Sequence, residues 1–239
     1  MEKKPILVWD WDGTLVDSLD YKYDGIWEEV FSDDKDRQGA VKEFINISAG
    51  KGVNRYGLIQ HALIETGSSE IANISGEALR ENELIKKYAH IYGEAARKQI
   101  REKGLFPGVK DTLENLYKEG YPMYIVSGGG TDQDLGEMAE DLDVSRYFRG
   151  IFGFGPHGAS LISFGKEENI KRVMALEQDS DPSHYIIIGD GETDKLFAEE
   201  TGCRFIGIAN RWNGWAVDNK QIMASLGDAG RLIKNSYDE

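Results

Sequence analysis

Short apolar runs alternate with amphipathic stretches along much of the chain. The run Ile6 to Trp9, bounded by Pro5 and Asp10, has the length and composition of a strand buried on both faces. The same pattern predicts four more strands, at Met123–Val126, Gly150–Phe154, Tyr185–Ile188 and Phe205–Ile208. It also predicts four helices, which are Pro107–Tyr117, one between the strands Met123–Val126 and Gly150–Phe154, Glu167–Leu176 and Thr193–Thr201. Strands that alternate with helices in this way predict a parallel sheet with right-handed crossovers.

Between the first two of these strands, from Ser18 to Gly104, the pattern is helical throughout. Leu84, Tyr88, Ile91 and Ala95 are spaced i, i+4, i+7 and i+11, which places one apolar stripe along a helix. The expected helices lie near Leu19–Phe31, Val41–Ile47, Val53–Thr66 and Gly76–Glu102. These segments predict an all-helical insertion.

The fold class that follows is α/β: a doubly wound, Rossmann-like parallel sheet of five strands with an inserted all-helical domain. A length of 239 residues fits one core domain with a smaller insertion. We assign residues 1–17 and 104–239 to the core, and residues 18–103 to the helical domain.

Charge and sequence length narrow the range of partners. The formal net charge is −14, and nucleic-acid binding needs clustered Lys and Arg, so we expect no nucleic-acid partner. An anionic substrate would need a bound divalent cation to invert the local field. The apolar run after Lys4 is too short for a signal peptide, and no stretch approaches membrane-spanning length. The single cysteine, Cys203, fits a reducing compartment, so we expect a cytoplasmic protein without a membrane partner.

Two carboxylates, Asp10 and Asp12, directly follow the first strand and precede Gly13 and Thr14. Open α/β sheets bind their ligands at the carboxyl ends of the strands. Asp and Gly are also ordinary turn residues, but two acids at the end of a buried strand are electrostatically costly without a use. This stretch therefore predicts an active site.

A second acidic cluster, Asp190, Glu192 and Asp194, follows the strand Tyr185–Ile188. If the two strands are neighbours, Asp10 and Asp190 converge and need a cation or raised pKa values. Oxygen ligands of this kind suit Mg²⁺ beside a substrate phosphate. Acids placed at a helix N-terminus would explain Glu192, and in part Asp194, without a metal.

Two further positions can hold an anion. Ser127 precedes Gly128 and two more glycines, so a hydroxyl and backbone N–H groups are available there, although such a loop is often only a turn. Lys166 lies at a predicted helix start, at the carboxyl end of the sheet, and is preferred over Lys171 for that reason. The G-x-G-x-x-G pattern from Gly153 to Gly158 opens no predicted helix, so we do not interpret it as a dinucleotide site.

In this order, the four sites resemble the motifs of the haloacid dehalogenase superfamily of phosphohydrolases. D-x-D-G-T begins at Asp10, Ser127 and Lys166 match the second and third motifs, and G-D-x-x-x-D ends at Asp194. The helical insertion resembles the cap of phosphoglycolate phosphatase-like members. The resemblance implies that the first strand is central, between the Met123–Val126 and Tyr185–Ile188 strands. Dehalogenases of the superfamily lack the second acid, so Asp12 favours phosphoryl transfer.

The resemblance implies a Mg²⁺-dependent phosphatase that acts on a small phosphorylated metabolite. Asp10 would attack phosphorus and form an aspartyl-phosphate, which water then hydrolyses. Asp12 would act as general acid and then as general base. The Asp10 and Asp190 carboxylates and the Asp12 backbone carbonyl would hold the Mg²⁺ ion.

Other residues would bind the substrate around this centre. By the same resemblance, Ser127, the backbone N–H of Gly128 and Lys166 would bind the phosphate oxygens, and Asp194 would orient Lys166 or a water molecule held by the metal. Substrate contacts beyond the phosphate are expected from polar residues at the start of a predicted helix and in the loop after the last strand, which are Lys51, Asn54, Arg55 and Arg211.

Two other functions stay open at this point. A phosphomutase would use the same intermediate and return the phosphoryl group to a sugar, and it would need a bisphosphate activator. A non-catalytic phosphate-binding protein could keep the same fold without turnover.

Overall fold

A parallel sheet forms the larger part of the molecule in the computed structural model, which describes residues 3–48, 54–153, 165–218 and 220–235. The strand order is β3-β2-β1-β4-β5-β6. The strands are β1 (Ile6–Trp9), β2 (Met123–Val126), β3 (Gly150–Phe152), β4 (Tyr185–Gly189), β5 (Arg204–Ile208) and β6 (Ile222–Met223). The predicted α/β class is confirmed. As expected, β1 is central, with Leu7 in register with Met123 of β2 and with Ile186 of β4.

The predicted number of five strands was wrong, because the sheet has a sixth. Strand β6 consists of Ile222 and Met223 alone, and Met223 is in register with Ile208 of β5. A two-residue strand is too short to produce a visible apolar pattern. The third strand ends at Phe152, and residue 154, where we expected its end, lies outside the described residues.

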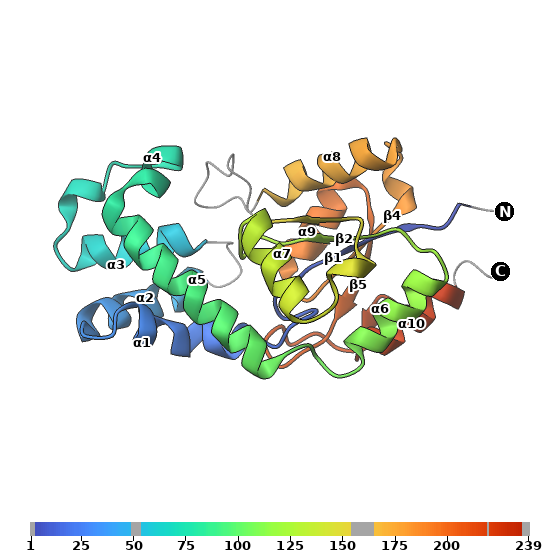
Figure 1. The fold of residues 1–239 in the computed structure, drawn as a ribbon, viewed down its shortest axis with the longest axis horizontal. Helices are drawn as coiled ribbons and strands as arrows, with labels where there is room; N and C mark the ends of the chain where they lie inside the picture. The colour runs from blue at the N-terminus through green and yellow to red at the C-terminus, as the bar shows by residue number, and fades with distance from the viewer. Residues whose placement is uncertain (1–2, 49–53, 154–164, 219, 236–239) are drawn as a thin grey trace.

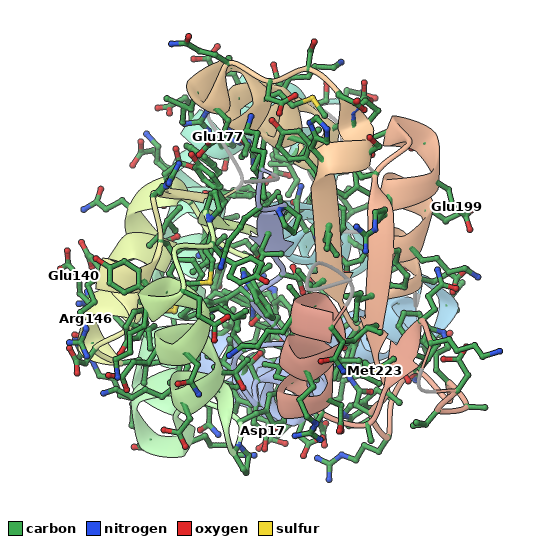
Figure 2. All side chains as sticks on the ribbon, turned by 90° about the vertical axis from the view of Figure 1, so that its right-hand side faces the viewer. Asp17, Glu140, Arg146, Glu177, Glu199 and Met223 are labelled. Atoms are coloured by element: carbon green, nitrogen blue, oxygen red, sulfur yellow. The ribbon has the colours of Figure 1, made fainter. Side chains whose placement is uncertain are left out.

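Helices cover both faces of the sheet, and alternate residues of β1 face each layer. Leu7 and Trp9 pack with one set of helices, and Ile6 and Val8 with the other. The first set is α6 (Val109–Lys118), α7 (Asp132–Asp141) and α10 (Leu226–Asn235), and the second is α8 (Lys166–Glu177) and α9 (Glu192–Thr201). Figure 2 shows the two layers on opposite sides of the strands, with Glu140 of α7 and Glu199 of α9 at opposite edges of the view.

The helices between β1 and α6 in the sequence lie together at the other end of the molecule (Figure 1). They are the π-helical turn η1 (Tyr21–Gly25), α1 (Ile26–Val30), α2 (Lys35–Ser48), α3 (Arg55–Glu65), the 3₁₀ turn η2 (Ser69–Ile71), α4 (Gly76–Glu81) and α5 (Glu83–Lys103). They enclose a hydrophobic core of their own, which includes Trp27, Ile59, Leu63 and Ile85. The predicted limits of this helical domain, residues 18–103, stay a prediction. No helix in the described part of the chain is both long and apolar enough to span a membrane.

The single helix predicted from Gly76 to Glu102 is two helices in the structure. Asn82 is extended between them, and its side chain caps α5 by accepting hydrogen bonds from the N–H groups of Leu84 and Ile85. Of the stripe expected at Leu84, Tyr88, Ile91 and Ala95, Ala95 is buried and the other three are partly buried. The buried positions of α5 also include Ile85, Ala89, Tyr92 and Ala96.

A bridge between two chain segments and a set of ion pairs hold the inserted helical domain, called the helical layer below, beside the sheet. The chain leaves the sheet and returns to it side by side, because Val16 forms an antiparallel bridge with Leu105. Further out, Arg97 and Arg101 of α5 each donate to Asp141 of α7, at 2.8 and 2.7 Å. The carboxyl ends of the central strands therefore face the helical layer.

Candidate active site

A cavity of about 250 Å³ lies between the carboxyl ends of the strands and the helical layer. The structure brings most of the predicted site residues to its wall, from the loops after β1, β2 and β4 and from the helices. These are Asp10, Asp12, Asn54, Arg55, Ser127, Gly128, Lys166, Asp190 and Asp194. Lys51 lies outside the described residues, and Arg211 is not among the lining residues.

Lys166, at the first position of α8, joins two of the buried acids. Its Nζ donates to Asp10 Oδ1 at 2.8 Å and also pairs with Asp194 Oδ1. Lys171, five residues further along α8, points outward, with 67% of its side chain exposed against 10% for Lys166, and it pairs with Glu167. Of the two lysines, Lys166 is the one that reaches Asp10, and its assignment to the phosphate stays a prediction.

Asp190 is held by residues from two loops. Thr14 Oγ1 donates to Asp190 Oδ1 at 3.1 Å, and Asn210 Nδ2 donates to Oδ2 at 2.7 Å. Gly13 lies against the same carboxylate at φ +76°, where a Cβ would come within 2.3 Å of Asp190 Oδ2. Only glycine satisfies both the positive φ and this close approach. Asn210 was not predicted, although it stands beside Arg211, which was.

The cluster of Asp10, Asp190 and Asp194 fits a divalent cation. Each offers a carboxylate oxygen, and these oxygens lie within 4.8 Å of one another. Burial raises the pKa of Asp10 well above its ordinary range, against the attraction of Lys166. Burial, and then the charge of Asp194, raise the pKa of Asp190 to about 6. One lysine does not offset three buried carboxylates, and hard oxygen donors of this kind favour Mg²⁺ or Ca²⁺.

The carboxylate of Asp12 points away from this cluster, toward the helical layer. Ser18 Oγ donates to its Oδ1 at 2.6 Å, and Lys22 Nζ pairs with Oδ2. Burial disfavours the charge of Lys22, but the pairing with Asp12 outweighs it, so the pKa of Lys22 lies above its usual value. Gly129 closes over this pair, since a Cβ there would come within 2.3 Å of Asp12 Oδ2.

Sequence reasoning missed Lys22. It belongs to the π-helical turn η1, between two exposed or half-exposed tyrosines, and nothing in its spacing distinguishes it from a solvated surface lysine. The turn nevertheless directs both Lys22 and Tyr23 to the cavity wall. Single π-helical turns of this kind are frequent at functional sites.

Ser127 lies at the end of β2, buried, with its hydroxyl on the cavity wall. Its Oγ accepts a hydrogen bond from the N–H of Gly129 at 3.2 Å, and the hydroxyl proton is left to donate to a ligand. The neighbouring backbone of Gly128 also lines the cavity. The loop thus brings a hydroxyl group and the backbone of Gly128 to the cavity that Asp10 also lines.

The residues predicted from the helical domain have contacts of their own. Arg55 Nη2 donates to Asp134 Oδ2 at 2.8 Å and to the Gly129 carbonyl at 3.2 Å, so it links α3 to the core. Asn54 caps α3, because its side chain accepts hydrogen bonds from two backbone N–H groups. Arg211 is 64% exposed and pairs with Asp20.

Comparison with known proteins identifies relatives of this chain. The phosphoglycolate phosphatase of Pseudomonas fluorescens (strain Pf0-1) is 22% identical over 239 residues, covering 98% of this chain and 80% of the relative. The phosphoglycolate phosphatase of Escherichia coli (strain K12) is 29% identical over 157 residues, which span 61% of this chain and 56% of the relative.

Solved structures share the fold. A predicted phosphoglycolate phosphatase from Haemophilus somnus 129PT has a TM-score of 0.68 at 16% identity and covers 97% of this chain and 99% of its own. A 2-haloacid dehalogenase from Pseudomonas syringae pv. tomato DC3000 has a TM-score of 0.62 at 14% identity, with coverage of 98% and 100%. The fold alone therefore does not separate phosphatases from dehalogenases.

A model of the haloacid dehalogenase-like hydrolase family matches residues 7–208, which include all four predicted motifs. This match confirms the resemblance read from those motifs, and the prediction of a hydrolase with it. The chain belongs to the haloacid dehalogenase-like hydrolase family.

Proposed function

We propose that this hydrolase is a Mg²⁺-dependent phosphatase that cleaves a small phosphate monoester through an aspartyl-phosphate on Asp10. The observation that carries the proposal is the convergence of Asp10, Asp190 and Lys166 on one wall of the cavity, with Asp12 on the side of the helical layer. The second acid, Asp12, favours phosphoryl transfer over dehalogenation. The curated relatives, which carry the name phosphoglycolate phosphatase, support a small phosphorylated metabolite as substrate.

Asp10 and Asp190, with the backbone carbonyl of Asp12, would hold the Mg²⁺ ion. When bound, the ion offsets the negative charge of the carboxylates and of the phosphate, so that like charges can meet. Asp194 accepts from Lys166 and from the N–H of Gly191, and its place is to orient the lysine beside Asp10.

The reaction would run in two displacements at phosphorus. A carboxylate oxygen of Asp10 forms a bond to phosphorus as the bond to the ester oxygen breaks, and Asp12 gives its proton to the leaving alkoxide. Water then attacks the aspartyl-phosphate, with Asp12 taking the proton, and phosphate and the free Asp10 carboxylate result. Lys166, Ser127 and the N–H of Gly128 would bind the three equatorial oxygens, which carry most of the transition-state charge.

We assign the helical domain, residues 18–103, the role of a cap that contacts the rest of the substrate. Its side of the cavity combines the cations Lys22 and Arg55 with Tyr23 and Tyr92. Lys22 keeps the Asp12 carboxylate turned toward the cavity, because it pairs with Oδ2 while Ser18 holds Oδ1. Closure of such a layer excludes water from the reaction.

The test is phosphate release from a panel of phosphorylated metabolites and an aryl phosphate, with and without Mg²⁺. We expect turnover that requires Mg²⁺ and is removed by chelation with EDTA. Undiminished turnover in EDTA would contradict the proposal. A requirement for a sugar bisphosphate activator, with transfer instead of release, would identify a phosphomutase.

Lys166→Met is expected to lower kcat/KM about 100-fold, the effect of removing one donor to the transition-state oxygens. Lys171→Met is the matched control, five residues along the same helix, where the side chain is exposed and we expect no change. Lys166→Met leaves Asp10 and Asp194 without their shared partner, so thermal unfolding is measured to check that the variant is folded. Equal activity of the two variants would exclude the assigned role of Lys166.

A further inference from the structure

The loop after β5, residues 209–215, holds Asp190 from a side that the proposed mechanism does not use. Asn210 Nδ2 donates to Asp190 Oδ2 at 2.7 Å, and Asn213 Nδ2 donates to the Asp190 backbone carbonyl at 2.8 Å. Thr14 Oγ1 reaches the other carboxylate oxygen at 3.1 Å. Each oxygen of Asp190 thus has one protein donor and keeps lone-pair capacity for a cation.

The orientation of both asparagine side chains follows from their other hydrogen bonds. Asn210 Oδ1 accepts from the N–H groups of Trp212 and Asn213, at 2.8 and 3.1 Å. Asn213 Oδ1 accepts from the N–H groups of Asn210 and Trp215, at 3.2 and 3.1 Å. Backbone N–H groups only donate, so each amide oxygen must face them, and the Asn210 NH₂ group must face Asp190.

The tip of the same loop is anchored on the helical cap. Arg211 pairs with Asp20, and the ring of Trp212 lies 5.4 Å from the ring of Tyr23, tilted by 52°. Asp20 and Tyr23 belong to the first turn of the cap, and Tyr23 also lines the cavity. The loop therefore contacts both the cap and Asp190, and these contacts restrict the motion of the Asn210 side chain.

We propose that Asn210 is a positioning residue that fixes the Asp190 carboxylate in the orientation that binds Mg²⁺. The proposal rests on the proposed function, because it takes Asp190 as a metal ligand. Without the Asn210 donor, Thr14 still holds Oδ1 but Oδ2 loses its protein donor, so the terminal torsion of Asp190 is less tightly restrained, and ordering it again on metal binding costs affinity. Hydrogen bonds to metal-ligating groups change metal affinity by about 10- to 100-fold when they are removed.

The test measures Mg²⁺ binding by isothermal titration calorimetry without substrate. Asn210→Ala is expected to raise the dissociation constant for Mg²⁺ about tenfold. Excess Mg²⁺ should reverse most of the accompanying loss of turnover, because Asp10 and Asp12 are unchanged. Asn210→Ser separates the donor from the loop. Its hydroxyl can still accept from the N–H of Trp212 two residues on, but it is too short to reach Asp190, so we expect the same weakening.

Asn115→Ala, at an exposed position of α6, is the control and should bind Mg²⁺ as the wild type does. Wild-type affinity in both Asn210 variants overturns the proposal. Wild-type affinity in Asn210→Ser alone also overturns it, because Asn210 would then act only by shaping the loop. A wild-type protein that binds no Mg²⁺ would refute the proposed function itself, which distinguishes the two failures. Thermal unfolding in EDTA checks that each variant is folded, and Asn210→Ser carries the test if Asn210→Ala is not.

Discussion

Asp10→Asn is expected to abolish phosphate release, with kcat lowered at least about a thousandfold. The amide has nearly the shape of the carboxylate but is not a nucleophile, so no aspartyl-phosphate forms. Burial is the main reason that the pKa of Asp10 is raised, so removing the charge should not unfold the protein. The measurement is single-turnover phosphate release at saturating Mg²⁺.

Asp111→Asn, on the exposed surface of α6, is the matched control and should leave the rate unchanged. Both variants should unfold at temperatures close to that of the wild type. Turnover by Asp10→Asn at the wild-type rate would falsify the assignment of Asp10 as nucleophile.

Asp190→Asn is expected to have two effects of opposite sign. The variant should lose the stabilisation that Mg²⁺ gives the wild type, which at a concentration 100 times the dissociation constant is about 3 kcal/mol. In EDTA at pH 7 it should instead be more stable than the wild type, by about 1–3 kcal/mol, because a buried charge has been removed. Burial, and then Asp194, raise the pKa of Asp190 to about 6. The measurement is thermal unfolding with and without Mg²⁺.

The pH dependence of this difference has a definite sign. The folded-state pKa of Asp190 lies above that of an ordinary aspartate, so the native state binds the proton more tightly than the unfolded chain does. The ionised carboxylate therefore destabilises the metal-free wild type increasingly as the pH rises from about 4 to about 6. Asp190→Asn should lack this pH-dependent contribution. The control variant Glu199→Gln should retain it, because Glu199 is an exposed residue of α9. An Mg²⁺-induced stabilisation of Asp190→Asn equal to that of the wild type would rule out Asp190 as a ligand.

Five of the strands were predictable because each is a short, largely apolar run followed by small or polar residues. Buried parallel strands have no polar face, so Ile6–Trp9 and Tyr185–Gly189 can be recognised from the sequence alone. The short strand β6 did not, because two residues carry no pattern and its pairing is decided by β5. Helix α10 was also not predicted. The break at Asn82 was missed because helical periodicity continues across it, and only the side-chain cap reveals the new start.

The acids of the site were predictable for a similar reason, since Asp10 and Asp190 follow directly on strands and Asp12 and Asp194 lie within five residues of the strand ends. The partners that orient them were not. Lys22 reaches Asp12 through a π-helical turn, and Asn210 reaches Asp190 from a loop beyond the next strand. Contacts of this kind depend on how segments distant in sequence pack, which local pattern does not encode. Arg211 was predicted as a site residue because it is charged, and Asn210, the uncharged residue beside it, was not predicted.

The central position of β1 has a consequence for how the chain folds. The neighbours of β1, which are β2 and β4, both lie beyond the whole helical layer in the sequence. During synthesis the apolar segment Ile6–Trp9 therefore leaves the ribosome long before either strand that will cover its edges. The helices of the layer have mostly local contacts and a core of their own, so they can form first. Until β2 arrives, Ile6–Trp9 is an exposed strand edge, and this interval is when a nascent chain of this fold is most in need of a chaperone.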